Sequence, residues 1–256
     1  MDHLLQSYLI ICPLVFLGGF VDSVAGGGGL ITLPAYMLAG IPVHMSMGTN
    51  KIAASLGGLT ATAQYIRSGK INFSIAIPAA IFAYLGGQVG AGTAMHLSED
   101  FLNVMMLVVL PVVAVFLTLK KDLGSDTAIP REMSKLRQYA IAAFIGFFTG
   151  MYDGMVGPGT GTFMIMLFSA FLSVDLITSS GCAKMANMAS GVASAVVFTL
   201  GGQIMWAVVI PAVLSNILGC FCGSRYAIKG GGKRVRSMIF VVLALLFVKM
   251  IYEVIA

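Results

Sequence analysis

Apolar residues run through this chain in long stretches that short polar breaks separate. Met185–Ser224 contains forty residues without a charge, which as a helix is about 60 Å long, roughly two crossings of a 30 Å hydrocarbon core. Ile71–Met95 and Phe101–Leu119 are also uncharged, and each is long enough for one span. The pattern predicts helical membrane segments near 4–21, 29–41, 52–66, 73–95, 101–119, 138–153, 161–172, 185–199, 204–224 and 237–255.

Two of these segments are short for a crossing. The thirteen residues of 29–41 cover about 20 Å of a 30 Å core, and segment 161–172 is of similar length. Either they are half-helices of hairpins that enter the membrane and return, or they extend through the neighbouring loops. In both cases each half of the chain makes an odd number of passes.

The second half of the chain repeats the first. Four positions of a motif that combines a carboxylate with glycines recur at one constant offset: Gly19, Asp22, Gly26 and Gly28 as Gly150, Asp153, Gly157 and Gly159. Six positions downstream recur at a second offset, longer by two: Lys51, Gly69, Ile71, Pro78, Gly86 and Gly90 as Lys184, Gly202, Ile204, Pro211, Gly219 and Gly223. A duplicated apolar chain with Gly-rich breaks at matching positions is typical of secondary transporters.

The predicted fold is therefore an all-α integral membrane protein built from two inverted-topology repeats. Each repeat has about three to five membrane segments, eight to ten in total, and the discontinuous or re-entrant Gly-rich segments meet near the membrane midplane. The predicted boundaries are residues 1–119 for the first repeat and 138–256 for the second. A polar linker, residues 120–137, joins them.

Composition supports the membrane class. Of 256 residues, 58% are hydrophobic and only 10% are charged, whereas a soluble domain carries roughly 25% charged residues. A soluble protein with a large core is the formal alternative. The net charge of +5 does not indicate a nucleic-acid partner, because most of the cations lie in loops between the apolar segments.

The position of the basic loops predicts the orientation of the repeats. Twelve of the fifteen lysines and arginines (five, five and two) lie in 120–137, 225–236 and 67–70, while the counterpart loop at 97–100 is acidic. Only inverted repeats place all three basic loops on one face, which the positive-inside rule makes cytoplasmic. We expect a bacterial inner-membrane protein with both termini periplasmic and the linker 120–137 cytoplasmic.

Four ionisable residues fall inside apolar segments, as two duplicated pairs: Asp22 with Asp153, and Lys51 with Lys184. At roughly 2.5–3.5 kcal/mol per charge, they must pair, face water or titrate. One interpretation assigns the aspartates to proton coupling or gating. The alternative makes them helix caps or salt-bridge partners of the lysines, and the two interpretations are compatible.

Two glycine clusters each precede a segment that is predicted to be helical. Backbone N–H groups at a helix N-terminus suit an anion, and glycine lets a ligand approach closely. The candidate substrate-binding residues of these clusters are Gly26, Gly27, Gly28, Gly29, Gly157, Gly159, Thr160 and Gly161. Close helix packing through small residues is the alternative, and we assign Gly86, Gly90, Gly219 and Gly223 to packing.

A third group of polar residues opens the predicted helices 52–66 and 185–199. It combines cations, amides and a hydroxyl, which together suit an oxyanion with several acceptor oxygens. The alternative is that the lysines snorkel to the membrane interface. The candidate residues are Asn50, Lys51, Ser55, Lys184 and Asn187.

No set of residues indicates an enzyme, a metal or a cofactor. His3, His44 and His96 are scattered and lie outside the duplicated motifs, and the chain has no HExxH, GxSxG or Walker sequence. We assign no catalytic residue, no metal ligand and no cofactor.

At these motifs the chain resembles the TauE/SafE family of sulfite and sulfonate permeases, also called the toluene-sulfonate uptake permease family. The resemblance rests on GGFVDSVAGGGGLITLPAYMLAG, GTNK and YIRSGKI in the first half, and on GFFTGMYDGMVGPGTGTF, AKMAN and LGGQIMW in the second. It runs from about Gly18 to Arg236. In the second half GPGTG replaces GGGG and Lys184 lacks a preceding Asn, which puts a strictly two-fold site in doubt.

The resemblance implies an inner-membrane permease for small sulfur-containing or organic anions such as sulfite or sulfonates. The expected partners are a small anionic substrate and the lipid bilayer, and self-association is left open. We expect alternating access between the two repeats, with proton coupling through the aspartates as one form of it. A cation transporter and a non-transporting membrane scaffold subunit are the alternatives.

Overall fold

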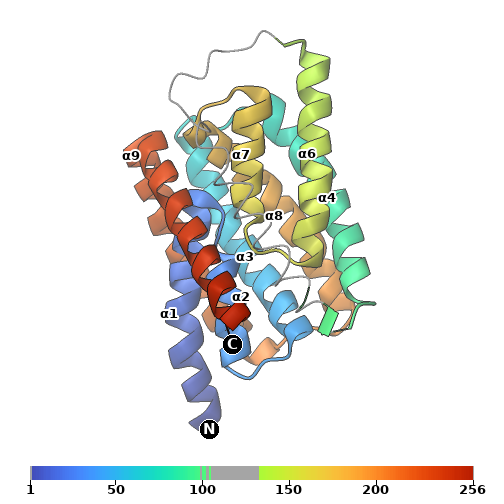
Figure 1. The fold of residues 1–256 in the computed structure, drawn as a ribbon, viewed down its shortest axis with the longest axis vertical. Helices are drawn as coiled ribbons and strands as arrows, with labels where there is room; N and C mark the ends of the chain where they lie inside the picture. The colour runs from blue at the N-terminus through green and yellow to red at the C-terminus, as the bar shows by residue number, and fades with distance from the viewer. Residues whose placement is uncertain (1, 99, 102–103, 105–132, 256) are drawn as a thin grey trace.

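A computed structural model of the chain describes residues 2–98, 100–101, 104 and 133–255. The described residues form a bundle of helices and contain no strand (Figure 1). All but two residues of the predicted segment 101–119, and most of the linker 120–137, lie outside the described residues. The helices are α1 (Asp2–Ala25), α2 (Gly29–Leu38), α3 (Val43–Arg67), α4 (Phe73–Ala94), α6 (Lys135–Met155), α7 (Thr160–Leu172), α8 (Leu176–Leu200) and α9 (Trp206–Ile255). Helix α9 is kinked at Gly231, where the backbone is not helical.

Among the described residues, four helical stretches are long and apolar enough to cross a membrane: Ser7–Ala25, Phe73–Ala94, Leu176–Leu200 and Trp206–Val242. Large apolar side chains also cover the outside of the bundle, for example Leu136, Ile210 and Phe144, which are 65–80% exposed. A surface of this kind is costly in water and favourable against lipid acyl chains. The all-helical membrane class is therefore confirmed.

The duplication extends to the helix boundaries. Helices α2 and α7 begin at Gly29 and Thr160, which are related by the offset of the glycine motifs. The starts of α3 and α8, and those of α4 and α9, are related by the second, longer offset. Helices α3 and α8 also have the same length, 25 residues each. Both offsets match those read from the sequence motifs, so each half builds the same series of elements.

The predicted starts of the two long central helices are wrong by nine residues. Helix α3 begins at Val43 rather than near 52, directly after Pro42, and α8 begins at Leu176 rather than near 185. The Asp175 side chain caps α8 by accepting a hydrogen bond from the Thr178 amide at 3.0 Å. Lys51 and Lys184, which mark the predicted helix starts in the sequence, lie in the helix interiors.

Glycines hold α6 against α4 and α1 against α9, so each contact joins the first helix of one repeat to the fourth helix of the other. A Cβ on Gly86 or Gly90 of α4 would collide with the α6 backbone at Phe147 or Met151. In α9, the equivalent residues Gly219 and Gly223 meet the α1 backbone at Phe16 and Phe20 in the same way. The assignment of these four glycines to helix packing is therefore confirmed.

The two repeats enter the bundle from opposite ends. Figure 1 shows the start of α1 at the bottom of the bundle and the start of α6 at the top. Helix α7 then returns toward the end from which α6 came, as in a re-entrant hairpin. This arrangement is compatible with inverted repeats, and the inverted relation itself stays a prediction.

Candidate functional site

Two glycine-rich turns break the bundle at equivalent points. One joins α1 to α2 through residues 26–28, and the other joins α6 to α7 through residues 156–159. Gly26, Gly157 and Gly159 have φ angles of 79°, 95° and 81°, a region that glycine adopts without the steric cost of a Cβ. Glycine at these positions thus lets two helices stop inside an apolar bundle.

The first turn touches the start of α7, which directly follows the second turn. A Cβ on Gly26 would collide with the backbone of Gly161, and Thr162 Oγ1 donates a hydrogen bond to the Ala25 carbonyl at 2.6 Å. The prediction that the Gly-rich segments of the two halves meet is therefore confirmed, while their depth in the bilayer stays a prediction.

In the described part of the chain, two ion pairs link the repeats, and each joins a lysine of one repeat to an aspartate of the other. Lys51 Nζ lies 2.9 Å from Asp153 Oδ1, and Lys184 Nζ contacts Asp22 Oδ2. Lys51 and Lys184 are only 5% and 3% exposed. The salt-bridge interpretation therefore describes this state of the protein, and the snorkelling alternative for the lysines is wrong.

The two pairs differ in how completely they are satisfied. Lys51 also donates to the backbone carbonyl of Asp153, and Ser190 Oγ donates to Asp153 Oδ2 at 2.7 Å. Lys184 makes one hydrogen bond in the described structure, to Asp22. An ammonium has three donors, so the Lys184 pair retains unused bonding capacity.

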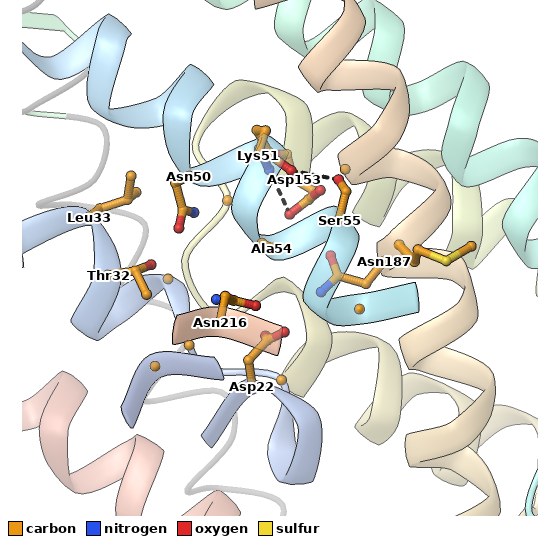
Figure 2. A pocket seen from close by; sticks show the side chains of 18 of the residues that line it. Asp22, Thr32, Leu33, Asn50, Lys51, Ala54, Ser55, Asp153, Asn187 and Asn216 are labelled. Carbon is orange, nitrogen blue, oxygen red and sulfur yellow. Dashed lines mark hydrogen bonds and ion pairs between the residues drawn. The ribbon is translucent and has the colours of Figure 1, made fainter. Parts of the chain in front are cut away.

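These residues surround a small cavity between α1, α2, α3, α6, α8 and α9 (Figure 2). Its volume of about 40 Å³ leaves room for about three waters at roughly 10–15 Å³ each. Eleven of the predicted site residues line it: Asp22, Gly26, Gly28, Gly29, Asn50, Lys51, Ser55, Asp153, Gly157, Lys184 and Asn187. A site of this size suits a group of a few heavy atoms.

Four predicted site residues lie outside the cavity lining: Gly27, Gly159, Thr160 and Gly161. Gly27 packs against Val242 of α9, and Thr160 Oγ1 donates to the Gly157 carbonyl at 2.7 Å. Of the two glycine clusters, residues 26–29 contribute three glycines to the lining and residues 157–161 contribute one, Gly157. The cavity is therefore less symmetric than the sequence motifs.

Sequence reasoning missed two polar residues of the lining, Thr32 and Asn216. Both are 2% exposed. Thr32 lies in the apolar run after the first glycine cluster, and Asn216 is an amide inside the longest uncharged stretch of the chain. A carboxamide in such a stretch is itself a signal of a functional site, because burying it requires a partner.

The sequence profile of the family described as Sulfite exporter TauE/SafE matches residues 11–250, nearly the whole chain. The chain belongs to the TauE/SafE family. The broken helices and duplicated ion pairs of this family member are thus parts of a membrane transporter, and its resemblance to the family, first drawn from the motifs, is confirmed.

Several relatives of this TauE/SafE protein carry the name of a probable membrane transporter. A protein from a Sinorhizobium species, ORF9, is 32% identical over 98% of this chain and 94% of its own length. One from Haemophilus influenzae is 30% identical over 99% of this chain and 98% of its own, and YfcA of Escherichia coli is 31% identical over 97% and 94%. No solved structure matches the chain.

Proposed function

We propose that the protein is a secondary transporter that moves a small oxyanion or sulfonate across the bacterial inner membrane. The observation that carries the proposal is the pair of buried lysines, Lys51 and Lys184, in one cavity beside two broken helices. Positive charge and helix N-termini at such a break are the features that transporters use for anionic groups. Sulfite and sulfonates fit this chemistry.

Proton coupling through the aspartates follows from the charge balance of the cavity. As described, two lysines face two aspartates, so the site has no net charge for an anion to meet. Protonation of Asp22 or Asp153 discharges one pair and frees one lysine for the anion. One proton and one monoanion then move together, which removes the electrical penalty of about 2.3 kcal/mol per 100 mV that opposes anion uptake.

In alternating access, two groups of helices move relative to each other, and these groups do not coincide with the two halves of the sequence. The glycine contacts fix α6 to α4 and α1 to α9, and each pairing joins the two repeats. We infer that α4 moves with the second repeat and α9 with the first. The Lys51–Asp153 and Lys184–Asp22 pairs then join residues that lie on opposite sides of the moving interface.

Flux into proteoliposomes tests the proposal. The purified protein is reconstituted, and uptake of labelled sulfite and of a small sulfonate is measured with and without an inward proton gradient. We expect saturable uptake that the gradient accelerates. A non-transporting scaffold moves no label, and a cation transporter moves a labelled cation instead; either result would overturn the proposal.

A further inference from the structure

The cavity contains neutral polar groups that neither ion pair uses. Thr32, Asn50 and Asn216 are 2%, 8% and 2% exposed, and Figure 2 shows them along one side of the cavity, with Asn216 beside Asp22. Thr32 Oγ1 and Asn50 Oδ1 have no hydrogen-bond partner among the described residues. The Cys220 thiol donates to Asn216 Oδ1 at 3.4 Å, and that bond does not use the amide nitrogen.

These three polar residues have no counterparts in the other repeat. The two offsets that relate the halves place Phe163 opposite Thr32, Ala183 opposite Asn50 and Ala83 opposite Asn216. A buried polar atom without a partner is rare because it loses its hydration and gains nothing in return. Helix packing needs none of the three, since the second repeat packs with apolar residues at the same positions. A ligand that supplies the partners missing at Thr32 Oγ1 and Asn50 Oδ1, and that also accepts from the Asn216 amide, explains them.

We propose that Thr32, Asn50 and Asn216 form a subsite, next to Lys184, for a small monoanion that carries its own hydrogen-bond donor. Lys184 supplies positive charge, the Asn216 amide and the Thr32 hydroxyl donate to oxygens of the anion, and Asn50 Oδ1 accepts the hydrogen of the anion. The inference rests on the proposed anion transport and specifies its ligand. In the other half of the site, Lys51 and Ser190 already bond Asp153, so that half has fewer unused hydrogen-bonding groups.

Anions of matched shape distinguish this subsite from a simple positive pocket. Hydrogen sulfite and chlorate are both pyramidal monoanions of four heavy atoms, and hydrogen carbonate and nitrate are both planar ones. The first member of each pair carries a donor and the second does not. The cavity volume of about 40 Å³ accepts anions of this size.

The experiment measures dissociation constants of these four anions for the purified full-length protein by calorimetry. Wild type should bind the donor-bearing anion of each pair about tenfold more tightly, the value of one hydrogen bond to a charged partner. Asn50→Leu should abolish this preference, while Thr32→Val should weaken both members of a pair equally. Ser190→Ala, in the other half-site, should leave the preference unchanged.

The outcomes separate the subsite from the proposed transport. The subsite proposal is overturned if the wild-type protein binds chlorate as tightly as hydrogen sulfite. It is also overturned if Asn50→Leu keeps the preference for the donor-bearing anion. In either case sulfite flux in proteoliposomes leaves the transport proposal standing. If Asn50→Leu does not fold, the nearly isosteric Thr32→Val tests the subsite instead. Unchanged affinities of that variant for the four anions also overturn the subsite. Wild type that binds none of the four anions and shows no flux overturns both proposals.

Discussion

Lys184 and Asp22 form an ion pair although 162 residues separate them in the chain. Each belongs to a different repeat, and the equivalent residues, Lys51 and Asp153, form the reciprocal pair. A lysine of each repeat is thus neutralised by the aspartate of the other. Any movement that separates the repeats at this point must either break a buried ion pair or protonate its carboxylate.

Replacing Lys184 with methionine should abolish anion flux and destabilise the protein. The substitution leaves the Asp22 carboxylate buried without its cation, and breaking a buried pair in this way costs about 3–5 kcal/mol. Flux in proteoliposomes and thermal unfolding in detergent measure the two effects. The double variant Lys184→Met/Asp22→Asn should recover most of the stability without recovering flux. Flux in that double variant would remove Lys184 from anion binding.

Replacing Asp22 with asparagine should uncouple transport from the proton gradient. Asparagine imitates the protonated carboxylate, so Lys184 is free for the anion at every pH. In proteoliposomes, an inward proton gradient should accelerate uptake by wild type and leave the rate of Asp22→Asn unchanged. The exposed Asp100 is the matched control, and Asp100→Asn should respond to the gradient as wild type does. A full response in Asp22→Asn would exclude this aspartate from coupling.

Adding a methyl group at the contact between α4 and α6 should destabilise the protein. A Cβ on Gly86 would overlap the Phe147 carbonyl and lie 2.8 Å from the Met151 amide nitrogen, and both are backbone atoms that cannot rotate away. Overpacking of this kind costs about 1–3 kcal/mol. Thermal unfolding of Gly86→Ala in detergent should show the loss.

Gly92 provides the matched control for Gly86. It lies in the same helix, and a Cβ there would have nothing within 4 Å. Gly92→Ala should raise the unfolding temperature slightly, because alanine is favoured over glycine in a helix by about 0.5–1 kcal/mol. Equal effects of the two substitutions would show that α4 does not pack on α6 through Gly86.

The orientation of the chain can be tested with reporters. The positive-inside rule predicts that a reporter inserted near Asp126 is cytoplasmic, and that reporters near Glu99 or after Ala256 are periplasmic. Fusions to a protein that is active only in the cytoplasm, and to one active only in the periplasm, measure this directly. Reporters near Glu99 and Asp126 on the same side would end the inverted-repeat prediction.

Much of the fold follows from the sequence because a membrane imposes one requirement on every segment. Backbone groups in lipid must be paired within the segment, so long apolar stretches become helices. The starts of α2 and α4 lie at the predicted residues, 29 and 73, since glycine and polar breaks mark them. Asp22 and Lys184 could be singled out from the sequence alone, because a charge at membrane depth is rare without a function.

Tertiary structure decided which partner each charged residue has and where the central helices begin. Pairing Lys184 with Asp22 lets this lysine lie inside α8, so a charge that reads as a helix boundary in the sequence does not end the helix. The same packing brings Thr32 and Asn216, from α2 and α9, to one cavity with unequal halves. The sequence motifs already differ between the halves, since GPGTG replaces GGGG and Lys184 lacks a preceding Asn, but only the packing shows which polar residues of distant helices meet in the cavity.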